Sequence, residues 1–142
     1  MLLSLIDGIE DCVFTENRIV LNEWLEKRYG MLMRKYTRNS IFEGFSSINN
    51  PFWHLETDGF WHLNYQGVRL NKGCTPSKAW LKDNVEFAYF DESLWILLQN
   101  ETMRKRLRNY IIESKLPDAH DGWISKAADG FSLLAGLLLA VA

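Results

Sequence analysis

Apolar residues recur every three or four positions in several segments of the chain, which is the spacing of helices that bury one face. The first segment, Leu2 to Ile9, has no N-cap residue before it, so it predicts a helix whose first turn is missing. A second segment carries Leu25 and Tyr29 and predicts a helix that starts near Asn22 or Glu23.

Polar residues that precede the later apolar segments predict three more helix starts. Thr75 is expected to cap a short helix that has Pro76 at its first position and continues through Leu81. Asp91 and Asn100 are expected to cap the last two helices. The positions expected to face inward in these two helices are Leu94, Trp95, Leu97, Leu98, Met103, Leu107, Tyr110 and Ile111.

A doubled motif lies in the middle of the chain. The stretch FWHLETDGFWHL, residues 52–63, repeats Phe-Trp-His-Leu around Asp58-Gly59, a dipeptide that favours a β-hairpin. A two-residue loop would leave both hairpin faces mixed, whereas a three-residue loop over 57–59 makes one face wholly apolar. We therefore predict the three-residue loop. The buried face would then be Trp53, Leu55, Trp61 and Leu63.

The opposite face of this hairpin would be largely polar, with His54 directly across from His62. Its full set is Phe52, His54, Glu56, Phe60, His62 and Asn64. The segment 85–90 alternates and is rich in strand-forming residues, so we expect it to join the hairpin. The predicted fold is a small, mostly helical α+β domain around a β-hairpin that is extended to a three-stranded antiparallel sheet.

Composition changes near Pro117. Residues 39–51 read as an irregular connection, and 1–116 read as one domain, but 117–142 ends in twelve nearly pure aliphatic residues. Twelve residues are too few to cross a bilayer, which takes about 20. We interpret 117–142 as a covering helix or as foreign sequence, and the apolar ends, 2–6 and 131–141, as possible contacts for a homo-oligomer.

Charge and cysteine content narrow the class of protein. The chain has 142 residues, 47% of them hydrophobic, and a formal net charge of -2, which indicates a globular protein without a generally basic surface. Outside 117–142, which holds one Lys and three Asp, the charges balance. Cys12 and Cys74 are the only cysteines and no signal peptide precedes them, so we expect reduced thiols and a cytoplasmic location.

Catalytic motifs are absent from the sequence. There is no C-x-x-C pair, no phosphate-binding glycine loop, no G-x-S-x-G and no H-E-x-x-H. His54 and His62, with Glu56 and Asp58 nearby, are an alternative metal site, but a third ligand at defined spacing is lacking and a closed site needs four. We expect no enzymatic activity, no metal and no cofactor.

Nucleic-acid binding is better supported than catalysis. Lys27, Arg28, Arg34, Lys35 and Arg38 fall within twelve residues of each other. Lys72 and Lys78 flank a polar loop, NKGCTPS. Cations position a phosphate backbone and a loop contacts base edges, so this combination favours DNA binding. A solvated helix face is the alternative interpretation of the same cations.

With the elements in this order, residues 1–116 resemble the N-terminal DNA sulfur-recognition domain of McrA-like HNH restriction endonucleases. The resemblance rests on MLLSLIDGIE, NRIVLNEWLEKRY, NPFWHLETDGFWHL and AYFDESLWILLQNETMRKRLRNYII, and the third segment is the most specific. It implies a module that binds double-stranded DNA carrying a phosphorothioate, with no membrane partner. The nuclease module of the relatives is not expected before Ala142.

The resemblance also implies where the sulfur would lie. In the family a Tyr-Pro pair and a small residue three positions after the proline form a shallow apolar pocket. Pro51 matches the proline, Asn50 stands where tyrosine would be, and His54 stands where the small residue would be. Met1 begins about where a His-basic-Pro segment should have ended. The residues expected to contact DNA are Asn50, Pro51, Phe52, His54, Asn71, Lys72, Ser77, Lys78, Arg34, Lys35 and Arg38.

Two other functions remain open from the residues. One is a non-enzymatic interaction module or truncated remnant that pairs through its apolar ends. The other is a metal-dependent hydrolase that uses His54 and His62.

Overall fold

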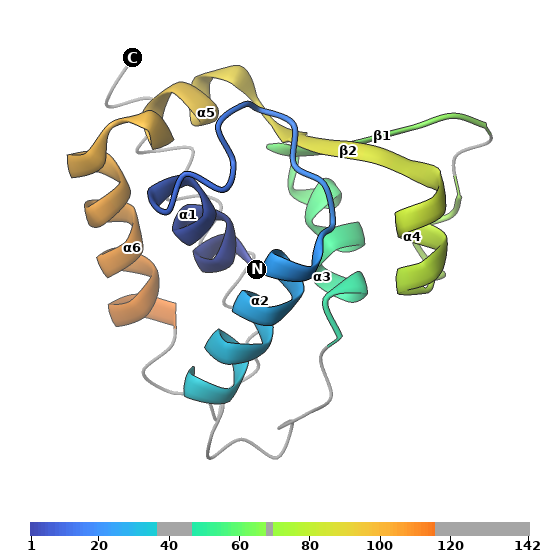
Figure 1. The fold of residues 1–142 in the computed structure, drawn as a ribbon, viewed down its shortest axis with the longest axis horizontal. Coiled ribbons are helices and arrows are strands. Elements are labelled where there is room, and N and C mark those ends of the chain that lie inside the picture. The colour runs from blue at the N-terminus through green and yellow to red at the C-terminus, as the bar shows by residue number, and fades with distance from the viewer. Residues whose placement is uncertain (37–46, 68–69, 116–142) are drawn as a thin grey trace.

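The computed structural model describes residues 1–36, 47–67 and 70–115 of the chain. Its elements in chain order are α1 (Leu2–Glu10), α2 (Glu23–Tyr36), α3 (Asn49–His54), the 3₁₀ helix η1 (Leu55–Asp58), β1 (Trp61–Tyr65), α4 (Lys78–Asn84), β2 (Val85–Phe90), α5 (Glu92–Gln99) and α6 (Glu101–Lys115) (Figure 1). Arg38, most of the connection at 39–51, and the segment 117–142 lie outside the described residues.

The expected three-stranded sheet is wrong. In the described part of the chain the sheet has two strands, and β1 pairs with β2 in antiparallel register, with Trp61 opposite Phe90 and Leu63 opposite Ala88. On the other edge of β2, Ile19 forms a single bridge with Ala88, and each residue donates its N–H to the carbonyl of the other at 2.7 Å. The fold is therefore a small, mostly helical α+β domain around a two-stranded ribbon.

The expected hairpin over residues 52–63 is also wrong. The first copy of Phe-Trp-His-Leu lies in α3 and η1, and only the second copy enters a strand, β1. Pro51 lies in the first turn of α3, where its missing N–H costs no helical hydrogen bond. Gly59 has φ 87° and ends η1 in a left-handed conformation, so Asp58-Gly59 stops a helix and does not turn a hairpin.

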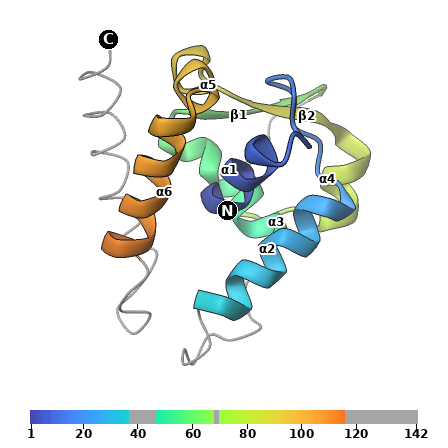
Figure 2. The ribbon, with the colours of Figure 1, turned by 60° about the vertical axis from the view of Figure 1, so that its left-hand side comes forward.

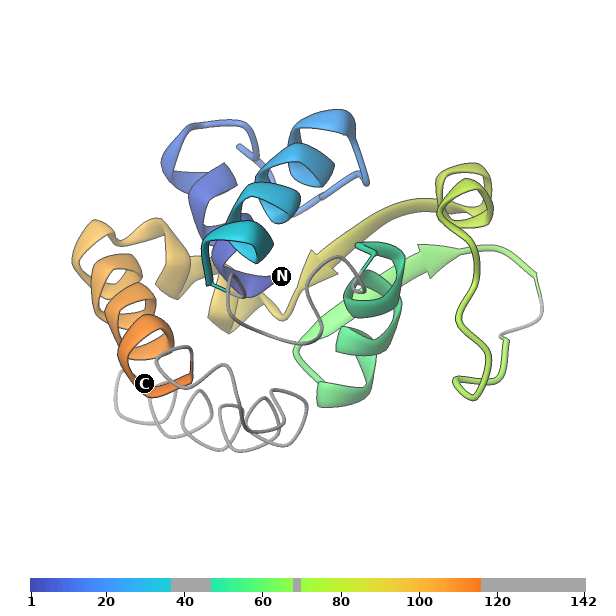
Figure 3. The same cartoon turned by 90° about the horizontal axis from the view of Figure 1, so that it is seen from below.

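The aromatic core unites both copies of the motif. Trp53 and Trp61 are fully buried and Leu63 nearly so, which confirms them as core, while Leu55 is partly buried. Phe52 and Phe60, expected on the polar face, are buried as well. Phe52 meets Trp61 edge-on with 5.6 Å between ring centroids, and the Trp61 indole N–H donates to the Phe52 carbonyl at 3.0 Å. Thus α3 covers the core face of the ribbon (Figures 1 and 3).

Helix α1 lies at the centre of the helical part of the domain. It contacts α2, α5 and α6, with α2 and α6 on either side of it (Figure 2). Every residue from Leu3 to Ile9 is buried, including Ser4 and Asp7. The Asp7 carboxylate forms ion pairs with Arg28 of α2 and Arg108 of α6, so the buried charge is partnered.

The helix starts agree with some of the predicted caps and differ from others. Asn100 Oδ1 accepts the Met103 N–H at 3.1 Å, which confirms Asn100 as a cap, and Asn22 Oδ1 accepts the Leu25 N–H at 2.9 Å, which confirms a helix start near Asn22. The cap expected at Thr75 is wrong, because Ser77 Oγ accepts the Trp80 N–H at 3.1 Å. Asp91 precedes α5 as expected, but its side chain makes no cap hydrogen bond. None of the described helices has the length and apolarity to cross a membrane.

Candidate nucleic-acid interface

Helix α3 and the loop 70–77 form one surface. The loop is about 20 positions downstream of α3, and three hydrogen bonds hold it there. His54 Nε2 lies 2.7 Å from Thr75 Oγ1, the Asn49 amide donates to the Pro76 carbonyl at 2.9 Å, and Lys72 Nζ donates to the Trp53 carbonyl at 2.9 Å. These contacts bring together Asn50, His54, Asn71, Lys72 and Ser77, which the sequence analysis placed in separate segments.

Lys72 is the main anchor between the loop and α3. Its ammonium lies 3.7 Å from the centre of the Trp53 ring and 3.0 Å from Glu56 Oε1. Glu56 is itself fixed, because its Oε2 accepts the Leu63 N–H of β1 at 2.8 Å. The Lys72 side chain is 29% exposed to solvent, and its ammonium contacts groups of the protein itself.

The loop has its own turn. Asn71 Oδ1 accepts the Gly73 N–H at 2.9 Å, and the Asn71 carbonyl accepts the Cys74 N–H at 3.1 Å. Asn71 and Ser77 are exposed, and Ser77 caps α4. The rim of the surface is therefore a short, hydrogen-bonded turn.

The residues of α3 divide between the surface and the core. Asn50 is exposed, Pro51 is half-buried, and His54, three positions after Pro51, lies on the same helical face. Phe52 is fully buried and does not reach the surface. Burial, and then the charge of Lys72, lower the pKa of His54 below its ordinary value, so its imidazole is mainly neutral at pH 7. Next to Pro51 the surface thus presents an uncharged ring.

The basic residues are mostly neutralised by nearby carboxylates. Lys78 and Lys82 of α4 both pair with Glu26 of α2, each at 2.9 Å. Lys27 pairs with Glu23 at 2.7 Å within α2. Arg28 pairs with Asp7 and Asp11 on the α1 side of the domain. In each of these pairs a carboxylate compensates the positive charge. Basic residues that are close together in the sequence therefore do not form a continuous positively charged surface.

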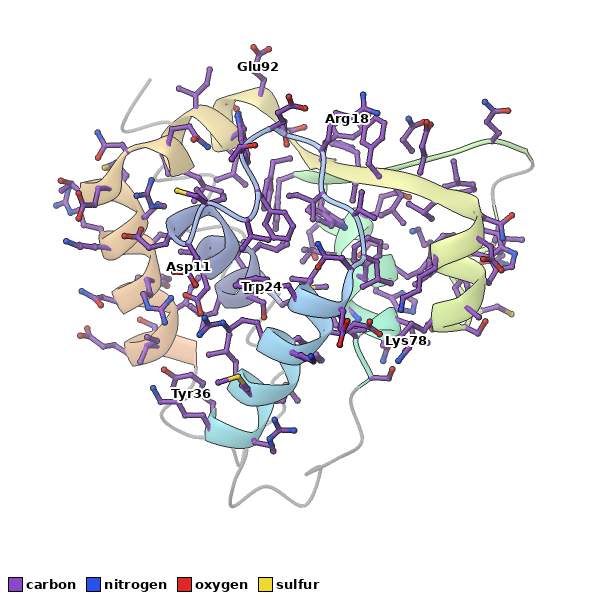
Figure 4. All side chains as sticks on the ribbon, in the orientation of Figure 1. Asp11, Arg18, Trp24, Tyr36, Lys78 and Glu92 are labelled. Atoms are coloured by element: carbon purple, nitrogen blue, oxygen red, sulfur yellow. The ribbon has the colours of Figure 1, made fainter. Side chains whose placement is uncertain are left out.

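Two expected cations differ from the rest. Arg34 and Lys35 lie exposed in the last turn of α2 and have no carboxylate partner within residues 1–36, 47–67 and 70–115. Lys35 Nζ lies 5.2 Å from the centre of the Tyr36 ring. Figure 4 shows Tyr36 at the end of α2 away from the ribbon, and Lys78 beside α4. Within the described segments, Arg34 and Lys35 are thus exposed cations that no carboxylate contacts.

The two histidines are not opposed. His54 belongs to α3 and contacts Thr75, whereas His62 belongs to β1, faces Tyr89 across the ribbon and contacts Asp91 Oδ1 at 2.5 Å. The expected pairing is wrong because the first motif copy is helical. No group of three or more metal-type ligands occurs within the described segments of the chain.

Sequence reasoning missed the partners of the lysines. Glu56 was considered only as a possible metal ligand and not as the partner of Lys72. Glu26 was not singled out, and neither was Lys82, which follows Lys78 by one helical turn. The i, i+4 spacing of the two lysines was visible in the sequence, but their shared partner is 52 and 56 positions away.

Comparisons of the chain with protein-family models and with curated proteins gave no match.

Proposed function

We propose that this chain is a non-enzymatic recognition module that binds the backbone of double-stranded DNA through α3 and the loop 70–77, and prefers a backbone that carries a phosphorothioate. The observation that supports this best is the assembly of α3 and the loop into one exposed polar surface around Pro51, through the contacts of His54, Asn49 and Lys72. Polar side chains on such a surface position a duplex through its phosphates.

The chemistry around Pro51 suits a sulfur atom. Sulfur in place of a phosphate oxygen is larger, softer and less well hydrated, so it gains more from an apolar contact. The half-buried Pro51 ring is an apolar surface of this kind, and the imidazole of His54 beside it is mainly neutral at pH 7. The thiophosphate charge would be met by donors at the rim, such as the Asn50 and Asn71 amides.

Arg34 and Lys35 extend the charge available to DNA. They lie eight and nine residues after Glu26 on α2, which corresponds to ~12–14 Å along the helix axis. That separation is comparable to a few phosphate spacings along one strand. A duplex that also reached the α2 side of the protein would thus meet further cations along this helix.

A binding competition tests the proposal. A labelled duplex with one central phosphorothioate is titrated with the protein, and then displaced by unlabelled duplexes of the same sequence with and without the sulfur. We expect tighter binding of the sulfur-containing duplex. We also expect affinity for both duplexes to fall between about 50 mM and about 200 mM salt, because phosphate contacts release counterions.

Pro51→Ser gives the matched variant. It should lower the preference for the sulfur-containing duplex while leaving affinity for the unmodified duplex nearly unchanged, since only the apolar contact is removed. Ile96→Ser, which alters an exposed apolar side chain of α5, is the control and should change neither quantity. Undetectable binding of both duplexes, or binding that does not depend on salt, would overturn the proposal.

A further inference from the structure

We infer that Lys78 and Lys82 of α4 together bind a DNA phosphate, in addition to the contacts of the α3–loop surface. The carboxylate of Glu26 on α2 pairs with both lysines until that phosphate displaces it. The inference rests on the proposed function, and it adds Lys82 as a binding residue and Glu26 as a residue that limits affinity. It concerns a place in the fold distinct from the Pro51 surface, at the contact of α4 with α2.

The geometry is that of a carboxylate bridging two ammonium groups. Glu26 Oε1 lies 2.9 Å from Lys78 Nζ, and Glu26 Oε2 lies 2.9 Å from Lys82 Nζ. Because the lysines are four positions apart on one helix, their side chains project from the same face of α4. One carboxylate with two oxygens therefore fits the pair, and so does one phosphate group with its two free oxygens.

Exposure shows which partner can move. The Glu26 side chain keeps only 18% of its exposure, whereas Lys78 keeps 50% and Lys82 keeps 41%. The two lysine side chains are thus more open to solvent than the Glu26 side chain. An incoming anion would meet the lysines first, and they can turn outward without any movement of α2.

The bridge is present at neutral pH. Burial raises the pKa of Glu26, but hydrogen bonds and charge interactions with Lys78 and Lys82 outweigh this effect, and the pKa is lowered from its ordinary value. Glu26 is therefore ionised, and it cancels one of the two positive charges on α4. Each lysine must give up this partner to bind phosphate fully, which reduces the net gain of the contact.

Lys72 differs from this pair. It also contacts a carboxylate, Glu56, but it additionally donates to the Trp53 carbonyl and lies over the Trp53 ring. Its side chain is less exposed than either α4 lysine. Lys72 is thus fixed inside the protein, whereas Lys78 and Lys82 form ion pairs only with Glu26 in the described residues and can exchange it.

Binding of an unmodified duplex to charge variants tests the inference. Glu26→Gln should tighten binding roughly two- to fivefold, the range expected for releasing an exposed ion pair. It should also steepen the dependence of log K on log salt by about 0.9, the value for one additional phosphate contact. Glu101→Gln is the matched control: it breaks an exposed glutamate–lysine pair of 2.8 Å on α6 and should leave both quantities near wild type.

Two further variants make the outcome specific. Lys82→Gln should cancel the gain in the Glu26→Gln background. If thermal unfolding shows that Glu26→Gln does not fold, the double variant Lys78→Gln/Lys82→Gln replaces it and should weaken binding. Equal effects of Glu26→Gln and Glu101→Gln, or an unchanged affinity of the double variant, in a wild type that does bind DNA would overturn this inference alone. Absence of binding by wild type and Glu26→Gln would overturn the proposed function itself.

Discussion

The ammonium of Lys72 lies 3.7 Å above the centre of the Trp53 ring and donates to the carbonyl of the same residue at 2.9 Å. This pair joins the loop 70–77 to α3 across 19 positions of sequence. Trp53 is fully buried and also meets Trp80 edge-on, with 6.0 Å between ring centroids. The loop is therefore tied to the same aromatic cluster that forms the core of the ribbon.

Lys72→Gln should destabilise the fold. The change removes the cation–π contact and the ion pair with the partly buried Glu56 carboxylate, which together should lower the free energy of unfolding by about 1–3 kcal/mol. Urea denaturation measures this directly. Lys105→Gln removes an exposed pair on α6 and should change stability by less than about 1 kcal/mol, so similar losses in the two variants would contradict the anchoring role.

Asp7→Asn should be more costly. The carboxylate is buried between Arg28 and Arg108, and its neutralisation would leave two guanidinium groups facing each other without their shared anion. Loss of one partner of a buried pair typically costs about 3–5 kcal/mol. Asp11→Asn, at a more exposed partner of Arg28, is the comparison and should cost far less. A small, equal effect of both changes on the urea midpoint would show that Asp7 does not organise the helices.

Two helical glycines should respond to alanine in opposite directions. A Cβ at Gly8 of α1 would overlap the buried Phe14 ring, so Gly8→Ala should destabilise by about 1–3 kcal/mol despite its better helix propensity. At Gly30 of α2 the nearest atom is 3.6 Å away on the flexible Arg34 side chain, so Gly30→Ala should stabilise by about 0.5–1 kcal/mol. Thermal unfolding of both variants checks the two signs, and a stable Gly8→Ala protein would refute the close packing of Phe14 on α1.

His54 should make stability depend on pH. Its pKa is lowered in the folded state by burial and by the charge of Lys72, so above the ordinary pKa of about 6.5 both the folded and the unfolded forms are neutral. As the pH falls below that value, the unfolded chain takes up the proton first, and stability is lost. Urea midpoints at about pH 7.5 and about pH 5.5 should therefore differ less in His54→Gln than in wild type. An identical pH dependence would argue that His54 is not desolvated.

Local signals predicted the helices well and the centre of the chain poorly. The cap at Asn100 and the helix start near Asn22 are where the sequence places them, since a cap depends on neighbouring backbone groups. The cap expected at Thr75 lies two residues farther on, at Ser77. Asp91 was also expected to be a cap, but its carboxylate contacts His62 of β1 instead. A competing partner from a different element was not visible in the local pattern.

The doubled motif shows the same limit. Gly59 adopts the left-handed conformation that both a hairpin turn and a helix end require, so Asp58-Gly59 is compatible with either structure. The choice lies with β2, which pairs with β1 from about 20 positions downstream and leaves the first motif copy free to pack as a helix. The apolar positions that would form one face of a hairpin are therefore also compatible with a helix followed by a strand.

The candidate interface is divided in a similar way. From the sequence alone, Pro51, His54 and the loop after Asn71 could be named as a possible surface, and the structure brings them together. The sequence could not predict which lysines are paired with carboxylates, because Glu26 and Glu56 lie far in the chain from the lysines that they contact. Ion pairs between elements depend on how the elements pack, which residue spacing does not record.

The sequence by itself determined the helical segments other than α3 and η1, their apolar faces and the burial of Trp53, Trp61 and Leu63, because these follow from local backbone preferences and from the exclusion of apolar side chains from water. Only the tertiary structure decided that β1 pairs with β2, that the first motif copy is a helix, and which cations pair with a carboxylate. Those outcomes depend on contacts between distant segments, whose free energies are settled only when the whole chain packs together.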